Sequence, residues 1–437
     1  MAASSSTIKV PMPAKPQFEY ALEAKKYKNP EFGEMGTQYC HLYHVRLHEL
    51  KPHLLKSISE KWGTDAPVLE KIALVNLADC EVGQTYVIIG TLMKKFAKRQ
   101  GVFAKGKLRD NVNEITDRTE KWASDTDTLS AHDDSSHIQL SGAVNVGSLV
   151  TGMVVGLKGK KTSKTSPFVV EDVCLPGAPP TYSYGNSSSS TAPMDIDGQA
   201  VNTSLNLLRP MQKDGVYCGF VSGPLLARKE GLATLTDRVA SDPRIAHLVL
   251  AGNTYSNTLS KIKKADSAFA TLGKFVSVDI LPGFRDTHVV SFPLERPAPM
   301  LFPESAECPN VQGVPSPFDA RIGNLRVLGH AGEPTDDIMR CSTVEDTLSA
   351  LQLSLEARHV APTCPDTLNC ASFKDVDPLL LTESPTLYFA GNQAEAKAAR
   401  FHNTTLLCVP DLRKQAALVL VNMYDPTDVC MELLEWN

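Results

Sequence analysis

The sequence predicts an all-β barrel followed by an α/β sandwich, with a helical segment ahead of both. Three features of the 437 residues support this fold class. Runs of β-branched residues recur between residues 76 and 175, and a Pro- and Ser-rich stretch then interrupts the pattern. Beyond that stretch, short apolar runs end at small residues and pass into loops, as strands of an α/β sheet do. The length itself exceeds one ordinary core, so we expect two domains.

Composition and charge exclude several classes of protein. The formal net charge of -5 argues against a surface that binds nucleic acid over its whole area. The ten cysteines form no C-x-x-C pair, which predicts buried thiols in a reducing compartment rather than a zinc ribbon or an iron–sulfur cluster. The first fifteen residues lack the apolar stretch of a secretory signal, and no apolar run approaches the roughly 18–20 residues that span a bilayer. We therefore expect a cytosolic or nuclear protein without a membrane segment.

The N-terminal part divides into a tail and a helical segment. Residues 1–36 are rich in Ser, Pro, Lys and Glu, which predicts a flexible tail. Residues 37–75 predict helix that packs on the core, first from Gln38 to about Pro52 and then in a second piece up to Trp62. We expect the proline to interrupt the helix.

Residues 76–178 predict a small β-barrel. The polar stretch between Lys94 and Ser135 is expected to be a partly ordered excursion from it. The predicted strands are Tyr86–Met93, Ser136–Gly142, Ser148–Leu157 and Pro167–Cys174.

Residues 179–204 predict a Ser/Pro-rich linker, and residues 205–437 predict the α/β domain. One helix of this domain is expected to begin with a capping box formed by Ser342 and Glu345. The predicted strands that end at small residues are Val216–Ser222, Ala246–Leu250, Phe275–Leu281, Leu325–Leu328 and Pro385–Ala390, and two further strands are Thr404–Val409 and Ala416–Val421. Because such strand ends carry the site of an α/β fold, their loops are the candidate functional region.

These strand ends resemble the calcineurin-like metallophosphoesterase fold. The resemblance implies metal ligands in the order D-x-H, G-D-x-x-D, G-N-H-[DE], a lone His and G-H-x-H. Two divalent ions about 3.5–4 Å apart need a bridging carboxylate, and imidazoles supply directed nitrogen donors.

The ligand residues are replaced in this chain, although the turn glycines persist. Asn253 puts a neutral amide where the bridging carboxylate belongs, and Arg285 takes the place of the catalytic histidine. Only His359 matches a ligand, and we expect a core or interface role for it. The degenerate positions are Gly223, Leu225, Asn253, Ser256, Phe284, Arg285, His359, Asn392 and Ala394. We therefore expect no metal, no cofactor and no catalytic residue in this chain.

A second resemblance covers most of the chain, from about Gln38 to Val421. Runs such as Val87-Ile-Ile-Gly-Thr-Leu92, Phe168-Val-Val-Glu-Asp-Val-Cys174 and Leu281-Pro-Gly-Phe-Arg-Asp286 resemble the small subunit (B-subunit) family of eukaryotic DNA polymerase delta. The Pro-Asp-Thr-Leu-Asn-Cys370 element favours delta over the alpha and epsilon B-subunits. The family pairs an OB-fold with an inactivated phosphodiesterase domain, and the predicted barrel agrees with an OB-fold.

The resemblance also implies a role, partners and a location. We expect a non-catalytic scaffold subunit in DNA replication and repair, in the nucleus. Its partners would be the C-terminal metal-binding domain of the catalytic subunit and a third, elongated subunit. The sliding clamp would be reached indirectly, and the polymerase zeta catalytic subunit is a further candidate partner. Contact with DNA would be weak or indirect.

Two other functions remain open from the residues alone. One is a metallophosphoesterase with unusual ligands, namely His330, Asp336, Asp337 and His359. The other is an OB-fold protein that binds single-stranded DNA or an acidic partner through a basic loop. That loop comprises Lys94, Lys95, Lys98, Arg99, Lys105 and Lys107, together with Arg109.

Three histidines also lie at helical spacing near the N-terminus. His44 and His48 are four residues apart and could bind a metal, with His41 one turn earlier. The next histidine, His53, is one residue too far for an H-E-x-x-H motif, so we expect a surface or packing role.

Overall fold

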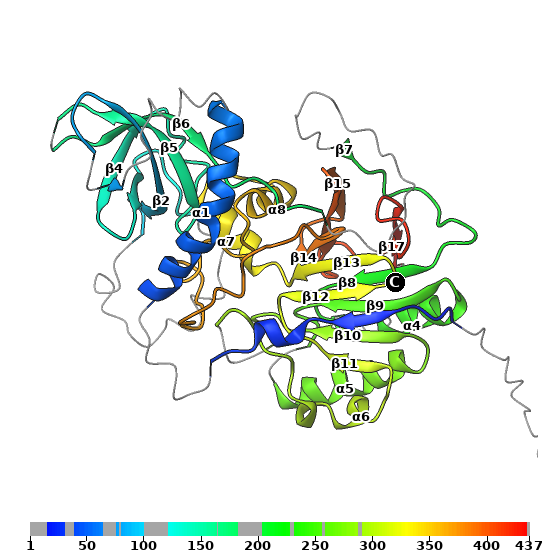
Figure 1. Cartoon of the computed structure of the whole chain (residues 1–437). Helices are drawn as coiled ribbons and strands as arrows, with labels where there is room; N and C mark the ends of the chain where they lie inside the picture. The colour runs from blue at the N-terminus through cyan, green and yellow to red at the C-terminus, as the bar shows by residue number, and fades with distance from the viewer. Residues whose placement is uncertain are drawn as a thin grey trace, which may run out of the picture.

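The computed structural model shows a closed five-stranded barrel joined to a two-sheet sandwich, with helices between them and on the far side (Figure 1). This arrangement confirms the predicted fold class of an all-β barrel and an α/β sandwich. The structure describes residues 15–30, 39–63, 76–77, 80–99, 121–163, 165–181, 203–227, 231–255, 258–286 and 291–434. None of the described helices combines the length and apolar character that crossing a bilayer requires.

The described part of the N-terminal stretch is an ordered arm on the sandwich. Strand β1 (Tyr20–Leu22) pairs antiparallel with β12 (Phe318–Ile322), and the short 3-10 helix η1 (Ala24–Tyr27) follows. Tyr27 is 1% exposed, and its hydroxyl donates to Asp319. The expectation of a flexible tail over residues 1–36 is therefore wrong for this part. The prediction rested on the polar composition of the whole stretch. It overlooked a few apolar side chains in a segment that adds a strand to the edge of the sheet.

Helix α1 (Cys40–Trp62) is continuous, so the expected break at Pro52 is wrong. Pro52 lies on the exposed side, where its missing N–H and its ring cost the helix one internal bond. Burial of Leu50 and Leu54, which pack against barrel residues such as Val87, offsets that loss.

The barrel closes because β2 pairs with both β3 and β5. Its strands are β2 (Thr85–Lys95), β3 (Thr128–His132), β4 (His137–Gly142), β5 (Val154–Lys161) and β6 (Phe168–Cys174). Two sequence expectations need correction. Strand β3 lies inside the stretch predicted as an excursion, and residues 148–153 form a turn, so β5 begins at Val154 rather than Ser148.

The sandwich has a seven-stranded sheet, ordered β1-β12-β13-β14-β16-β15-β7, and a six-stranded sheet, ordered β11-β10-β9-β8-β17-β18. Phe220 and Phe389 meet in the core between the sheets, with ring centroids 5.1 Å apart. The strands are β7 (Thr203–Ser204), β8 (Tyr217–Val221), β9 (Ile245–Ala251), β10 (Ser277–Leu281), β11 (Val311–Gly313), β13 (Leu325–His330), β14 (Leu387–Gln393), β15 (Lys397–Phe401), β16 (Thr404–Pro410), β17 (Ala417–Asn422) and β18 (Val429–Leu433). Since β7 pairs with β15, the last two residues of the expected linker belong to this sheet.

Helices cover the outer face of each sheet. Apolar residues of α4 (Gly231–Ser241) and α5 (Leu259–Gly273) pack on the six-stranded sheet, and the short η4 (Pro299–Leu301) and α6 (Pro303–Ala306) follow beside them. Between the barrel and the sandwich lie α7 (Glu333–Cys341) and α8 (Thr347–Glu356). Ile338 of α7 and Ala350 of α8 share one apolar cluster with Leu92 and Leu149 of the barrel.

The expected capping box of α8 is wrong. The N-cap is Asp346, whose carboxylate accepts a hydrogen bond from the Ser349 N–H at 3.0 Å. The Ser342 hydroxyl instead donates to the carbonyl of Ile338 at 2.7 Å and closes the preceding helix. The start of α8 therefore lies four residues later than the Ser342 signal indicates.

Arg46 joins α1, the barrel and the second domain. Its guanidinium is fully buried and donates to the Asp377 carboxylate at 2.8 Å. It also donates to the carbonyls of Gly152, Pro362 and Cys364, at 3.1, 2.9 and 3.1 Å. Gly152 has φ 84°, and a Cβ there would lie 2.0 Å from the Pro362 oxygen. Only glycine fits this approach of the two backbones.

Further contacts extend this junction. The Lys94 ammonium donates to the carbonyls of Leu149 and Cys341, at 3.2 and 2.8 Å, so a barrel lysine caps the end of α7. The Arg340 guanidinium lies 3.9 Å from the centre of the Trp122 ring. Backbone bonding reinforces this contact, because the Trp122 N–H donates to the Arg340 carbonyl at 2.9 Å.

His359 completes the polar network around Arg46. Its Nδ1 accepts from the Ala361 N–H, so Nε2 carries the proton and donates to Asp377 at 2.9 Å. Burial, together with the Arg46 charge, lowers the pKa of His359 to about 4. Burial alone would raise the pKa of Asp377. His359 and Arg46 outweigh burial and hold this pKa well below its ordinary value. The network therefore consists of one cation, one anion and a neutral imidazole.

We predict that Arg46→Met strongly destabilises the protein. The change leaves the buried Asp377 carboxylate without its cation and leaves three carbonyls without a donor, a loss of about 3–5 kcal/mol. Urea unfolding followed by circular dichroism measures it.

The matched control is Lys56→Ala in the same helix, where Lys56 pairs with Glu60 across 3.8 Å of exposed surface. This variant should unfold as the wild type does. An Arg46→Met midpoint equal to that of Lys56→Ala would contradict the role given to Arg46.

We also predict that stability falls with acid through His359. The folded chain keeps this imidazole neutral down to about pH 4, whereas an unfolded histidine binds a proton near about pH 6.5. Between these values the unfolded state binds more protons, so the contribution is complete above pH 6.5 and is lost as the pH falls. The slope is up to about 1.4 kcal/mol per pH unit.

Urea midpoints measured across this pH range for wild type and His359→Gln test the point. The wild type should show the steeper fall, because glutamine does not titrate. Equal slopes in the two proteins would count against the assignment.

Candidate functional site

The loops that follow five strands meet at one edge of the sandwich. Strands β8, β9 and β10 are mutually parallel, as are β13 and β14, so each set presents its carboxyl ends together. Hydrogen bonds join the two sets, because Asn392, near the carboxyl end of β14, contacts the loops after β8, β9 and β13. The structure thus brings Gly223, Asn253 and Asn392 to one place.

Asn392 is the centre of this region. Its side-chain nitrogen donates to the carbonyls of Ala331 at 2.8 Å, Gly252 at 3.3 Å and Ala251 at 3.4 Å. Its backbone N–H donates to the Ser222 hydroxyl at 2.7 Å. The amide therefore ties loops to one another where an imidazole ligand belongs in the metallophosphoesterase pattern.

Asn253 likewise joins two loops by a hydrogen bond of its side chain. Its side-chain oxygen accepts from the Arg285 N–H at 3.0 Å and so joins the loops after β9 and β10. Both asparagines follow a glycine and have left-handed backbones, with φ 56° for Asn253 and 60° for Asn392. Asparagine tolerates this conformation better than most residues, and that signal was available in the Gly-Asn pairs of the sequence.

The remaining degenerate positions differ in burial and in location. Leu225 is 2% exposed and Phe284 is 8% exposed, so apolar side chains pack at two former ligand positions. Ala394 is exposed, and Ser256 lies outside the described residues. His359 does not join the strand ends, since its partners Asp377 and Arg46 belong to the junction with α1.

The carboxylates near these loops serve backbone N–H groups. Asp286 is buried and accepts from Gly283 and Tyr255, each at 3.1 Å. Burial raises the pKa of Asp286 well above its ordinary value. Glu333 accepts from the Phe284 N–H at 2.9 Å. Among the described residues, no three His, Cys, Asp or Glu side chains gather at this edge closely enough to hold a metal ion.

The alternative ligand set does not form one centre. His330 is buried at the end of β13, and burial lowers its pKa to about 3. Asp337 is paired with Arg340 and accepts from Thr367, and His359 is bound to Asp377. Asp336 lies in the first turn of α7, one residue from Asp337 and therefore on a different side of the helix.

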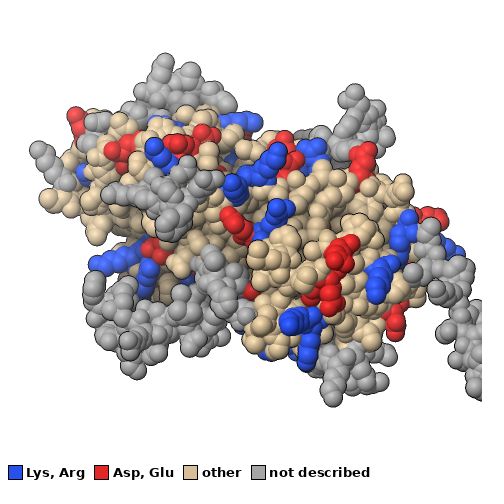
Figure 2. Space-filling view, turned by 90° about the horizontal axis from the view of Figure 1, so that it is seen from below, with Lys and Arg blue, Asp and Glu red and all other residues tan. Residues whose placement is uncertain are grey.

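The described residues of the predicted basic loop do not form a continuous cationic surface. Lys94 belongs to β2 and is buried, so its placement in a solvated loop is wrong. Arg99 pairs with Asp366 at 2.8 Å, whereas Lys95 and Lys98 are exposed. Lys105, Lys107 and Arg109 lie outside the described residues. On the face in Figure 2, basic and acidic side chains of the described residues are interspersed.

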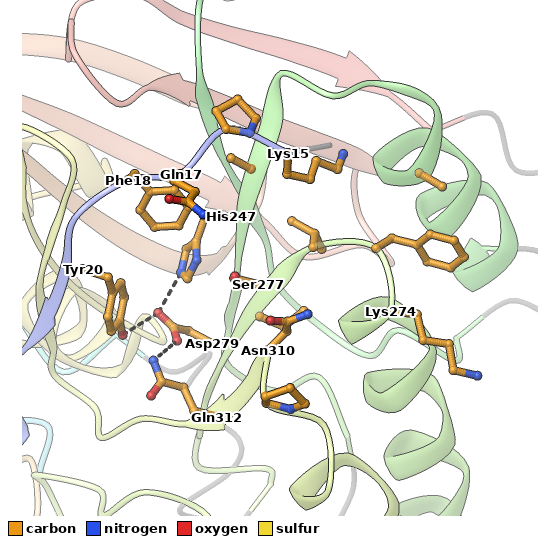
Figure 3. Close-up of a pocket in the computed structure, with 17 residues that line it drawn as sticks. Lys15, Gln17, Phe18, Tyr20, His247, Lys274, Ser277, Asp279, Asn310 and Gln312 are labelled. Carbon is orange, nitrogen blue, oxygen red and sulfur yellow. Dashed lines mark hydrogen bonds and ion pairs between the residues drawn. The ribbon is translucent and has the colours of Figure 1, made fainter. Parts of the chain in front are cut away.

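A hollow of about 700 Å³ lies at the other end of the parallel strands (Figure 3). It is lined near the amino ends of β9 and β10, whereas the convergent loops follow their carboxyl ends. At its floor Asp279 accepts from Tyr20 at 2.9 Å and Gln312 at 2.7 Å, and His247 lies 2.8 Å away. The bond from Tyr20 to Asp279 joins the N-terminal arm, in the seven-stranded sheet, to the six-stranded sheet. These polar groups therefore have a structural role.

Comparison with known proteins identifies both halves of the chain. The family described as "DNA polymerase delta subunit OB-fold domain" matches residues 38–173. The B-subunit family of DNA polymerases alpha and epsilon matches residues 219–399. The barrel lies within the first match except for its last residue, Cys174, and most of the sandwich lies within the second.

Whole-length relatives agree with these matches. The "DNA polymerase delta small subunit" of Arabidopsis thaliana is 29% identical, over 89% of this chain and 89% of the relative. The protein of the same name from Oryza sativa subsp. japonica is 26% identical, over 92% and 93%. The Drosophila melanogaster "DNA polymerase delta subunit 2" is 27% identical, over 88% and 91%.

Among solved structures, Vps29 of Cryptosporidium parvum aligns with 50% of this chain and 97% of its own, at 11% identity and a TM-score of 0.28. A likeness of that size adds nothing to the assignment. The family matches and the three relatives span barrel and sandwich together. The chain therefore belongs to the small-subunit (B-subunit) family of DNA polymerase delta.

Proposed function

We propose that this chain is a non-catalytic scaffold subunit of the replicative DNA polymerase delta. The observation that carries the proposal is the convergence of five strand ends whose described residues are bonded to one another. Asn392 alone contacts three of the other loops. Family membership across both halves of the chain supports the polymerase context.

The chemistry of these loops argues against phosphoester hydrolysis. A dinuclear centre needs carboxylates to neutralise two cations and to bridge them. Here an amide stands at the bridging position, and its oxygen already accepts a backbone N–H. The cationic Arg285 would add repulsion where a histidine belongs. The frame of the fold can therefore persist without the reaction.

The junction supports a scaffold role. Arg46, Lys94 and Arg340 fix the barrel against the sandwich, so a partner can meet both parts in one defined geometry. We propose the C-terminal metal-binding domain of the catalytic subunit as one such partner and a third polymerase subunit as another. The sliding clamp would be reached through these subunits, and DNA contact would be weak or indirect.

The cellular setting follows from this role. A subunit of a replicative polymerase acts in the nucleus, in DNA replication and repair. The polymerase zeta catalytic subunit is a second candidate partner, as the family resemblance implies.

We predict that the purified chain neither binds two stoichiometric metal ions at the strand ends nor hydrolyses bis-nitrophenyl phosphate with Mn²⁺. An active calcineurin-like phosphoesterase measured in the same assay supplies the positive control, and elemental analysis after desalting measures bound metal.

Turnover that disappears in His330→Ala or His359→Ala would revive the enzyme hypothesis. Two ions beside Asn253 and Asn392 would do the same, whatever the activity.

We further predict a stable one-to-one complex between the full chain and the C-terminal domain of the catalytic subunit. Size-exclusion chromatography with light scattering should detect it at low and at high salt, since a specific interface does not depend on long-range charge alone.

The control is the same C-terminal domain with its metal ligands replaced, which should not bind. Separate elution of the two native proteins at both salt concentrations would defeat the proposal.

A further inference from the structure

Three side chains from two separate elements converge on one face of the N-terminal helix. His44 and His48 are four residues apart on α1, and their rings lie side by side with centroids 4.4 Å apart. Asp134, from the turn between β3 and β4, reaches both of them. One carboxylate oxygen is 2.7 Å from His44 Nδ1 and the other is 3.1 Å from His48 Nε2.

Both platforms that carry these side chains are fixed. On the helix, the buried Arg46 lies between the two histidines in sequence, and Leu42 and Leu50 are also buried. In the turn, one oxygen of Asp133 accepts from the Ser135 and Ser136 N–H groups, and its other oxygen accepts from Leu77. The cluster is therefore held in place by groups outside it, as a preorganised site requires.

The donor set fits a particular class of cation. Two imidazole nitrogens and one carboxylate oxygen suit zinc and its neighbours, whereas magnesium and calcium prefer oxygen ligands throughout. Zinc bonds of about 2.0–2.2 Å place neighbouring donors roughly 3.3 Å apart. The ligand atoms here all lie within 4.8 Å of one another, so small side-chain rotations bring them to that spacing.

The site is also accessible. The side chains of His44, His48 and Asp134 are 56%, 54% and 50% exposed, which gives an ion a route in and leaves a fourth position to water. In the absence of an ion, the carboxylate bonds both rings and already draws the donors together.

We propose that His44, His48 and Asp134 form a divalent metal site of the zinc class that fastens α1 to the barrel. The ion replaces the two hydrogen bonds to Asp134 with coordinate bonds. It thereby links a helix that carries Arg46 to the β3–β4 turn, on the side of the helix that faces solvent. The site is separate from the strand-end loops and from the proposed scaffold function.

The test uses the full chain, freed of metal by a chelator and titrated with Zn²⁺ against a chromophoric competitor. We expect one ion per chain, and an affinity at least tenfold lower in His48→Ala and in Asp134→Asn. The control His53→Ala removes an exposed histidine from another side of the same helix and should bind zinc as the wild type does. Zinc should raise the melting temperature of wild type and His53→Ala, but not of the two site variants.

Outcomes of two kinds would overturn the proposal, one in the zinc affinities of the variants and one in the cobalt spectrum. One is zinc affinity that is unchanged in His48→Ala and Asp134→Asn, or that is lost in His137→Ala, which would move the ion to the stacked His132–His137 pair. The other is a thiolate charge-transfer band when Co²⁺ replaces zinc, because that band reports cysteine ligands. A visible d–d spectrum of nitrogen and oxygen ligation without such a band is the expected result.

Discussion

The buried guanidinium of Arg46 is the constraint on which the arrangement of this molecule depends. A cation that is fully removed from water is tolerated only where an anion and enough acceptors surround it. Those acceptors come from the Gly152 turn of the barrel and from the segment of Pro362, Cys364 and Asp377 in the second domain. Because no single element supplies them all, the helix, the barrel and the sandwich must assemble together before the charge is satisfied.

This dependence explains how a hydrolase-like frame can serve as a scaffold. The sandwich keeps the parallel strands and the sharp turns that would aim ligands at a metal, but its loop tips are joined by the amides of Asn253 and Asn392. Hydrogen bonds within the protein thus hold these loops together. With the barrel fixed against the sandwich, the two parts offer a partner one defined outer surface.

The sequence predicted the strands and the loops more successfully than the contacts between domains. Continuous apolar runs predict buried strands, and small residues indicate where these strands end. Interdomain polar contacts carry no such pattern. Lys94 is predicted to belong to a basic loop, yet it is buried and donates to the Cys341 carbonyl of the other domain. Arg46 offered one usable signal, since it interrupts an apolar stripe with Leu42 and Leu50 at four-residue spacing. The break predicted at Pro52 is wrong for a related reason. The burial of apolar residues on the opposite side of α1 outweighs the low helix propensity of proline.

Differential scanning calorimetry of the full chain tests the central claim most directly. If the network around Arg46 makes the barrel and the sandwich one cooperative unit, the wild type will melt in a single transition whose calorimetric and van't Hoff enthalpies agree. Two separate transitions in the wild type, one for each part, would show that the parts fold independently and would contradict the account.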